Sequence, residues 1–227
     1  MLPYSLIISD LHLSHSDQSA YQLFCQFLSE HQGKVSKLFI LGDFFEFWIG
    51  DDDPNPFYQK IINQLKICSD AGTSLFFMHG NRDFLIGKRF CQQSQMTLLT
   101  DPTILALHGH HILLTHGDLL CVQDRRYQRY RQVISQKWLQ WLFLKLPLSW
   151  RLHIAQQVRK DSQKQNHKNQ AHPYISDVDN RAVEKWLKTY PIDTLIHGHT
   201  HHFGQHQYEK QTRLVLSDWH QKGSYIV

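Results

Sequence analysis

The sequence is poor in cysteine, and its cysteines have no spacing typical of a site. The four cysteines are far apart, and no two of them form a Cys-x-x-Cys pair; they are Cys25, Cys68, Cys91 and Cys121. This pattern indicates neither a thiolate zinc site nor a disulfide framework. We expect reduced, buried thiols in a cytosolic protein.

The sequence also lacks a strong charge bias, an internal repeat and a long low-complexity segment. Its formal charge of +4 is weakly basic, which mildly favours phosphate-bearing partners. We expect no nucleic-acid partner and no obligate protein partner. The first apolar run already ends at Asp10, a candidate site residue, so we expect no secretory signal before it. A chain of 227 residues, 41% hydrophobic and 19% charged, predicts one domain over residues 1–227 with an insertion.

Strand and helix patterns alternate in the first third of the chain. Strands are predicted near 5–9, 37–41 and 74–78, and helices near 18–31 and 57–70, which is the rhythm of a parallel sheet. Short strands at 96–99, 103–107 and 111–115 are separated by Gly and Pro turns, which favours antiparallel pairing. Residues 124–171 are helical in composition. A helix near 177–189 and strands near 193–196, 203–209, 212–217 and 223–227 complete the prediction of two packed sheets flanked by helices.

Five apolar runs end in residues drawn from Asp, Asn and His. The polar residues at these ends are Asp10, His12, Asp43, Asn81, His116, His197 and His199. In sheets built from buried strands, ligands bind just beyond the carboxyl ends. Taken singly, Asp10 could be a helix cap and His116 a hydrogen-bonded core histidine. The fivefold recurrence favours one metal site assembled from five loops.

The number of candidate ligands exceeds what one ion needs. Three oxygen ligands and four imidazoles suit Mn²⁺, Fe or Zn²⁺ better than Ca²⁺. Two ions about 3.5 to 4 Å apart, bridged by one carboxylate, would use all seven side chains and hold a hydroxide between them. Such a pair is typical of enzymes that cleave phosphate esters.

The order Asp-x-His, Gly-Asp, Gly-Asn, His and Gly-His-x-His resembles the calcineurin-like metallophosphoesterases. The resemblance implies an α+β fold, a four-layer αββα sandwich with a helical lid insertion. It also implies that Asp10, His12, Asp43 and His199 hold one ion. The second ion would be held by Asp43, Asn81, His116 and His197, with Asp43 bridging.

Longer motifs are more specific than these short ones. They resemble the UDP-2,3-diacylglucosamine pyrophosphatases of lipid A synthesis, at Phe47 to Pro56, His116 to Gln128 and Trp138 to Leu148. The resemblance implies two Mn²⁺ per chain and an acylated UDP-sugar substrate. It further implies a peripheral enzyme on the cytoplasmic face of the inner membrane. The expected reaction releases diacylglucosamine 1-phosphate and UMP when a metal-activated hydroxide attacks the phosphorus nearest uridine.

The identity of Arg82 gives independent evidence on the kind of bond that is cleaved. Many metallophosphoesterases carry His after Gly-Asn, where it can protonate an alkoxide leaving group, but Arg is always charged and cannot. Arg82 can instead bind phosphate oxygens. An enzyme without that acid works best on a leaving group that is already a stable anion, such as a phosphate monoester. The alternative is that Arg82 merely pairs with Asp83 and Asp118.

The helical insertion, residues about 124–171, carries an apolar stretch between Lys137 and Lys145. It is too short to span a bilayer, which needs about 20 apolar residues. One interpretation is a packed hairpin that bends at Pro147. The other is a groove for acyl chains that also docks on an anionic membrane surface through flanking Arg and Lys residues. Both can hold at once.

The resemblance implies catalytic roles for Arg82, Asp43 and His197. It implies substrate contacts from Asn81, Arg82, Asp124, Ser162, Asn166 and His197. Asp124, Ser162 and Asn166 could otherwise be helix caps or solvated residues. Where the family pattern has a lysine this chain has Asn169, with Lys164 and Lys168 nearby. The other functions considered are a phosphoesterase of soluble dinucleotides or phosphodiesters, and a protein-binding scaffold without activity.

Overall fold

The computed structural model describes residues 4–169, 177–219 and 223–227, except for the side chains of 163 and 165–169. The chain forms two compact units. The first comprises Met1–His116 and Pro191–Val227, and the second, here called the helical unit, is Gly117–Tyr190. The helical unit includes the expected insertion.

The first unit contains a parallel sheet of four strands in the order β1-β2-β3-β4. The strands are β1 (Tyr4–Ile8), β2 (Val35–Leu41), β3 (Ser74–Met78) and β4 (Met96–Leu99). Leu38 lies opposite Leu6 on one side and Leu75 on the other, so apolar residues are in register across the sheet. Because all four strands are parallel, their carboxyl ends meet at one edge.

The second sheet has five strands in the order β5-β6-β7-β9-β8. The strands are β5 (Thr103–Leu107), β6 (His110–Thr115), β7 (Thr194–His197), β8 (Gly204–Tyr208) and β9 (Gln211–Val215). β6 and β7 are parallel, and Thr115 lies opposite His197. Two candidate ligand segments, after Thr115 and at His197, are thereby placed side by side.

Side chains from both sheets form one core. Its buried members are Ile7, Phe39, Leu41, Met78, Leu107, Leu114, Ile196 and Leu216. Full burial of each large apolar side chain stabilises the fold by about 1.5 to 3 kcal/mol. The predicted architecture of two packed sheets with flanking helices is confirmed.

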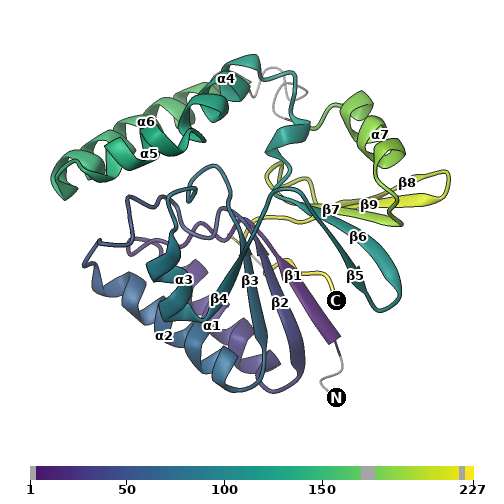
Figure 1. Ribbon diagram of the computed structural model, residues 1–227, viewed down its shortest axis with the longest axis horizontal. Coiled ribbons are helices and arrows are strands. Elements are labelled where there is room, and N and C mark those ends of the chain that lie inside the picture. Colours follow the sequence, from purple (N-terminus) through teal and green to yellow (C-terminus); the bar gives the residue numbers. More distant parts are fainter. Residues whose placement is uncertain (1–3, 170–176, 220–222) are drawn as a thin grey trace. The chain divides into compact units, whose positions relative to one another are not determined.

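Three helices lie beside the four-stranded sheet (Figure 1): α1 (Gln18–His31), α2 (Pro56–Asp70) and α3 (Lys88–Ser94). α1 begins after Asp17, whose carboxylate accepts bonds from two backbone N–H groups. α2 begins after Asn55, with Pro at its first position. At α3, the carboxylate of Asp51 accepts the N–H groups of Gly87 and Phe90 at 2.9 and 3.0 Å.

The helical unit contains a 3₁₀ turn (Asp118–Leu120), α4 (Arg125–Ile134), α5 (Lys137–Leu144), α6 (Leu148–Asn169) and α7 (Asn180–Thr189). Its apolar side chains are unusually exposed: Trp138, Trp141 and Trp150 have 66%, 62% and 63% of their surface accessible. In the described part of the chain, no helix combines the length and the hydropathy needed to cross a membrane.

Two predictions of strand structure are wrong. The segment 96–99 pairs in parallel with β3 instead of forming an antiparallel hairpin, because α3, which the sequence did not predict, carries the chain back to the start of the sheet. The segment 223–227 forms only an isolated bridge between Ile226 and Ile7. The antiparallel pairing of 103–107 with 111–115 is confirmed.

Candidate metal centre

The backbone turns sharply where the candidate ligands leave their strands. Four of them, Asp10 (58°), His12 (49°), Asp43 (50°) and His199 (67°), have φ in the left-handed region, and so does the nearby His201 (57°). Residues other than glycine adopt this conformation at a cost of about 1 to 3 kcal/mol each, and such residues cluster at functional sites. The packed sheets hold these strained turns in place.

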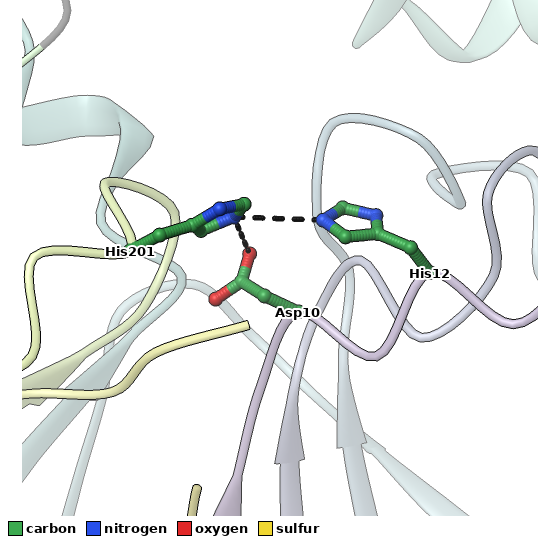
Figure 2. Close-up of side chains that lie close together, drawn as sticks. All are labelled: Asp10, His12 and His201. Carbon is green, nitrogen blue, oxygen red and sulfur yellow. Dashed lines mark hydrogen bonds and ion pairs between the residues drawn. The ribbon is translucent and has the colours of Figure 1, made fainter. Parts of the chain in front are cut away.

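Asp10, His12 and His201 form the first group of candidate ligands, with one ligand atom of each within 4.8 Å of the others. Figure 2 shows His201 Nε2 facing both partners, 3.4 Å from Asp10 Oδ1 and 3.5 Å from His12 Nε2. The other oxygen of Asp10 accepts the Ser9 hydroxyl and the His199 N–H at 2.6 and 2.8 Å. These bonds orient Oδ1 of Asp10 toward the two imidazoles.

Asp43, His116 and His199 form the second group. His116 Nε2 lies 3.7 Å from Asp43 Oδ1 and 3.2 Å from His199 Nδ1. Asn81 Oδ1 lies 3.1 Å from the same His116 nitrogen. Nδ1 of His116 lies 2.8 Å from the carbonyl of Leu41 and can donate to it, which leaves the Nε2 lone pair directed at the group.

The donor sets fit a pair of divalent cations. Ligand atoms about 2.0 to 2.2 Å from a common ion are separated from one another by about 3.0 to 3.6 Å. Five separations between ligand atoms, from 3.1 to 3.7 Å, lie in or close to this range, and all atoms of each three-residue group lie within 4.8 Å of one another. The backbone also joins the groups, since His12 N–H donates to the Asp43 carbonyl at 2.9 Å. Mixed oxygen and imidazole donors suit Mn²⁺, Fe or Zn²⁺.

The charges of the site are strongly coupled. Burial alone would raise the pKa of Asp10, but the hydrogen bond and charge of His201 hold it well below its usual range. Burial lowers the pKa of His201, whereas its bond to Asp10 and the charge of Asp218 raise it overall. Burial raises the pKa of Asp43. Burial and the neighbouring charge of Asp43 raise the pKa of Asp83 to about 7.

Two glycines are required by close packing in this region. A Cβ atom on Gly198 would collide with the side chains of Asp10 and Ser9, and one on Gly80 would collide with Asp43. The Gly-Asn and Gly-His motifs therefore let one ligand loop pass directly against the carboxylate of another.

Arg82 lies beside the second group. Its N–H donates to Asp43 Oδ1 at 3.0 Å, and its guanidinium Nε lies 3.5 Å from Asp43 Oδ2. Nη1 donates to Glu46 Oε1 at 2.5 Å. The alternative that Arg82 pairs with Asp83 is wrong, because the Asp83 carboxylate accepts the backbone N–H groups of Phe44 and Gly80 instead.

The structure brings six of the seven predicted ligands together in or beside these two groups. His201 lies beside Asp10 and His12, whereas the His199 ring lies with His116 and its N–H donates to Asp10. The assignment of these residues to particular ions stays a prediction. His197 is fully buried, and its Nε2 lies 3.3 Å from Nη1 of the buried Arg213. The ligand role of His197 stays a prediction.

One residue near the site, Glu46, was missed from the sequence. His201 continues the alternation of His197 and His199 and was expected near the site, where it could orient a ligand, but not as a ligand itself. Glu46 lies three residues after Asp43, but nothing in its spacing marks it as part of a site.

The predicted substrate contacts outside the first unit lie on helices. Asp124 caps α4, where its carboxylate accepts the Tyr127 N–H at 2.9 Å. Ser162 is exposed on α6. Asn166 and Lys168 belong to α6, but their side chains lie outside the described ones. The contacts of Asp124, Ser162 and Asn166 with substrate stay predictions.

A model of the family described as calcineurin-like phosphoesterase matches residues 5–203. The chain belongs to this family. The matched region contains every candidate ligand from Asp10 to His201, and the two His/Asp groups are those expected of a dimetal phosphoesterase. The predicted family membership is confirmed.

Curated relatives of this phosphoesterase extend over nearly its whole length. The UDP-2,3-diacylglucosamine hydrolase of Proteus mirabilis (strain HI4320) is 46% identical and covers 97% of this chain and 92% of its own length. Those of Aeromonas hydrophila subsp. hydrophila and Escherichia coli O9:H4 (strain HS) are each 42% identical, covering 98% of this chain and 93% of theirs. The resemblance of the longer motifs is thereby confirmed.

Proposed function

We propose that this phosphoesterase hydrolyses the pyrophosphate bond of UDP-2,3-diacylglucosamine in lipid A biosynthesis, giving 2,3-diacylglucosamine 1-phosphate and UMP. The names of the near full-length relatives support the substrate. The observation that carries the reaction is the convergence of two His/Asp groups beside the guanidinium of Arg82.

The proposed cofactors are two Mn²⁺ per chain. Their proposed ligands are Asp10, His12, Asp43, Asn81, His116, His197 and His199, and His201 lies beside Asp10 and His12. Bound there, divalent cations would supply an activated water and neutralise charge on phosphoryl oxygens. The balance of the reaction is simple. The oxygen of water joins the phosphorus nearest uridine, and the bridging oxygen leaves with the lipid phosphate.

Arg82 has the clearest chemical task among the protein's own side chains. Its side chain is 25% exposed, so it is reachable by substrate, and Asp43 and Glu46 hold the guanidinium in one orientation. A guanidinium fixed in this way binds phosphate oxygens and stabilises the charge that grows on them. Since it cannot protonate an alkoxide, the site favours an anionic leaving group.

The helical unit is proposed to hold the acyl chains and to dock on the membrane surface. Trp138, Trp141 and Trp150 are exposed on α5 and α6. Exposed aromatic and aliphatic side chains flanked by Arg and Lys are typical of helices that lie at an anionic lipid interface. Such a location fits the cytoplasmic face of the inner membrane.

A substrate panel tests the proposal. Metal-stripped and Mn²⁺-loaded protein would be offered the diacylated UDP-sugar, UDP-glucosamine and an aryl phosphodiester. We expect Mn²⁺-dependent hydrolysis that strongly favours the acylated nucleotide. Equal rates on acylated and bare nucleotides would refute the lipid role of the helical unit, and activity unaffected by chelation would refute the metal centre.

Arg82→His provides a matched variant for the same panel. We expect it to lower the rate on the pyrophosphate more than the rate on the aryl diester, because imidazole can protonate an aryloxide leaving group but is a weaker anchor for phosphate. A uniform loss on both substrates would contradict the leaving-group argument.

A further inference from the structure

Glu46 lies between a candidate metal ligand and the phosphate-binding arginine. One carboxylate oxygen, Oε1, accepts Arg82 Nη1 at 2.5 Å. The other, Oε2, lies 3.9 Å from Nδ1 of His12, within the range of an ion pair and beyond that of a hydrogen bond. The Glu46 side chain is only 12% exposed, so water screens these two interactions weakly.

The backbone places Glu46 with precision. The loops after β1 and β2 run side by side: His12 N–H donates to the Asp43 carbonyl at 2.9 Å, and Leu13 N–H donates to the Phe44 carbonyl at 2.9 Å. Glu46 N–H in turn donates to the Leu13 carbonyl at 3.1 Å. This ladder sets the side chain of Glu46 next to the imidazole of His12.

The two ring nitrogens of His12 face different partners. Nε2 points to His201 and the first ligand group, while Nδ1 faces Glu46. A carboxylate at the outer nitrogen of a ligating histidine favours a proton there, keeps the inner lone pair free for the ion and makes the ring a stronger ligand. Glu46 has the position and the charge for this task.

We propose that Glu46 is a positioning residue that couples metal binding at His12 to phosphate binding by Arg82. The link between Glu46 and Arg82 rests on the proposed function, whereas the link between Glu46 and His12 rests on the metal centre alone. Without the Glu46 charge, His12 would bind the ion less strongly and the guanidinium would lose its stronger anchor, retaining only Asp43 at 3.5 Å.

The test compares wild type, Glu46→Gln, Glu46→Asp, Arg82→Ala and the double variant Glu46→Gln/Arg82→Ala. Glu184→Gln, an exposed glutamate on α7, is the matched control. Mn²⁺ affinity would be measured by equilibrium dialysis, and kcat and KM with UDP-2,3-diacylglucosamine. Circular dichroism confirms that each variant is folded.

We expect Glu46→Gln to weaken Mn²⁺ binding several-fold. This is less than the loss of about 10- to 100-fold expected for a hydrogen-bonded partner, because Glu46 faces His12 as an ion pair at 3.9 Å. Glu46→Asp keeps the charge and should recover part of that affinity, while Glu184→Gln should bind Mn²⁺ as the wild type does. At saturating Mn²⁺, Glu46→Gln should still raise KM or lower kcat, and it should have little further effect once Arg82 is absent.

Two results would overturn the proposal. One is a Glu46→Gln variant that binds Mn²⁺ as tightly as the wild type. The other is a double variant in which the separate effects of Glu46→Gln and Arg82→Ala on kcat/KM multiply, as for independent residues. Absence of hydrolysis by the wild type would contradict the proposed function instead, and the metal-affinity series would still decide whether Glu46 supports His12.

Discussion

The Nδ1 atom of His199 lies 3.2 Å from the Nε2 atom of His116. His116 can donate from its other nitrogen to the Leu41 carbonyl, so its Nε2 is an acceptor that faces a second ring nitrogen, Asn81 and Asp43. One hydrogen can satisfy the histidine pair in the absence of an ion. A divalent cation would satisfy all four donors at once, which is why this arrangement is built for metal.

Metal removal should therefore reduce stability as well as abolish activity. We expect Mn²⁺ at 100 times its dissociation constant to raise the free energy of unfolding over chelated protein by about 2.7 kcal/mol for each independent site. Urea unfolding at several Mn²⁺ concentrations measures this. An unfolding curve independent of Mn²⁺ would contradict the metal centre.

His201→Ala tests the ligand set that the structure indicates. His201 lies within reach of Asp10 and His12, so its removal should weaken binding of one of two Mn²⁺ ions at least about tenfold. His110→Ala, which alters an exposed histidine at the start of β6, is the control. If His201→Ala binds two Mn²⁺ ions with unchanged affinity, His199 and not His201 is the ligand beside Asp10 and His12.

Gly198→Ala should damage the centre through shape alone. The added methyl group would overlap the side chains of Asp10 and Ser9, so we expect weaker Mn²⁺ binding and a loss of about 1 to 3 kcal/mol in unfolding free energy. Gly204→Ala meets only ordinary contacts at 3.6 Å and should be close to neutral. Equal behaviour of the two variants would show that the close approach at Gly198 is unimportant.

Asp118→Asn should destabilise the helical unit. The buried carboxylate accepts the Arg131 Nε–H at 2.6 Å and the Tyr127 hydroxyl, both from α4. Loss of charge-assisted bonds at a site where Arg131 is 26% exposed should cost about 1 to 3 kcal/mol in urea unfolding. The exposed Asp161→Asn on α6 should cost little, and a similar loss in both variants would count against this role of the Asp118 network.

Trp138→Ala tests the lipid role of the helical unit. Its side chain is 66% exposed, so the fold should tolerate the change, whereas kcat/KM for the diacylated nucleotide should fall several-fold and that for UDP-glucosamine should not. Ile67→Ser, which alters a half-exposed apolar residue on α2, serves as the control. A parallel loss on both nucleotides would argue for a structural role of Trp138.

Much of the site could be predicted because the sequence pattern marks the strand ends. Asp10, Asp43, Asn81 and His116 each follow a buried apolar run, and parallel pairing brings such ends together. The position of His201 beside Asp10 and His12 was not predicted. It depends on the left-handed turns at His199 and His201, and His-x-His spacing carries no information on those turns.

Glu46 and the parallel pairing of β4 were hidden for related reasons. Glu46 reaches the site through a ladder between two loops, a contact between residues more than thirty positions apart. β4 joins the first sheet because α3 leads back to it, although the turns after β4 look like those of a hairpin. In both cases, backbone pairing between segments far apart in the sequence determined the structure, and the local sequence pattern did not reveal it.

The position of bond cleavage tests the central claim most directly. Hydrolysis of UDP-2,3-diacylglucosamine in ¹⁸O-labelled water by the Mn²⁺-loaded protein, followed by mass spectrometry of both products, identifies the phosphorus that water attacks. We predict one ¹⁸O atom in UMP and none in 2,3-diacylglucosamine 1-phosphate. Label in the lipid phosphate, or products other than these two, would contradict it.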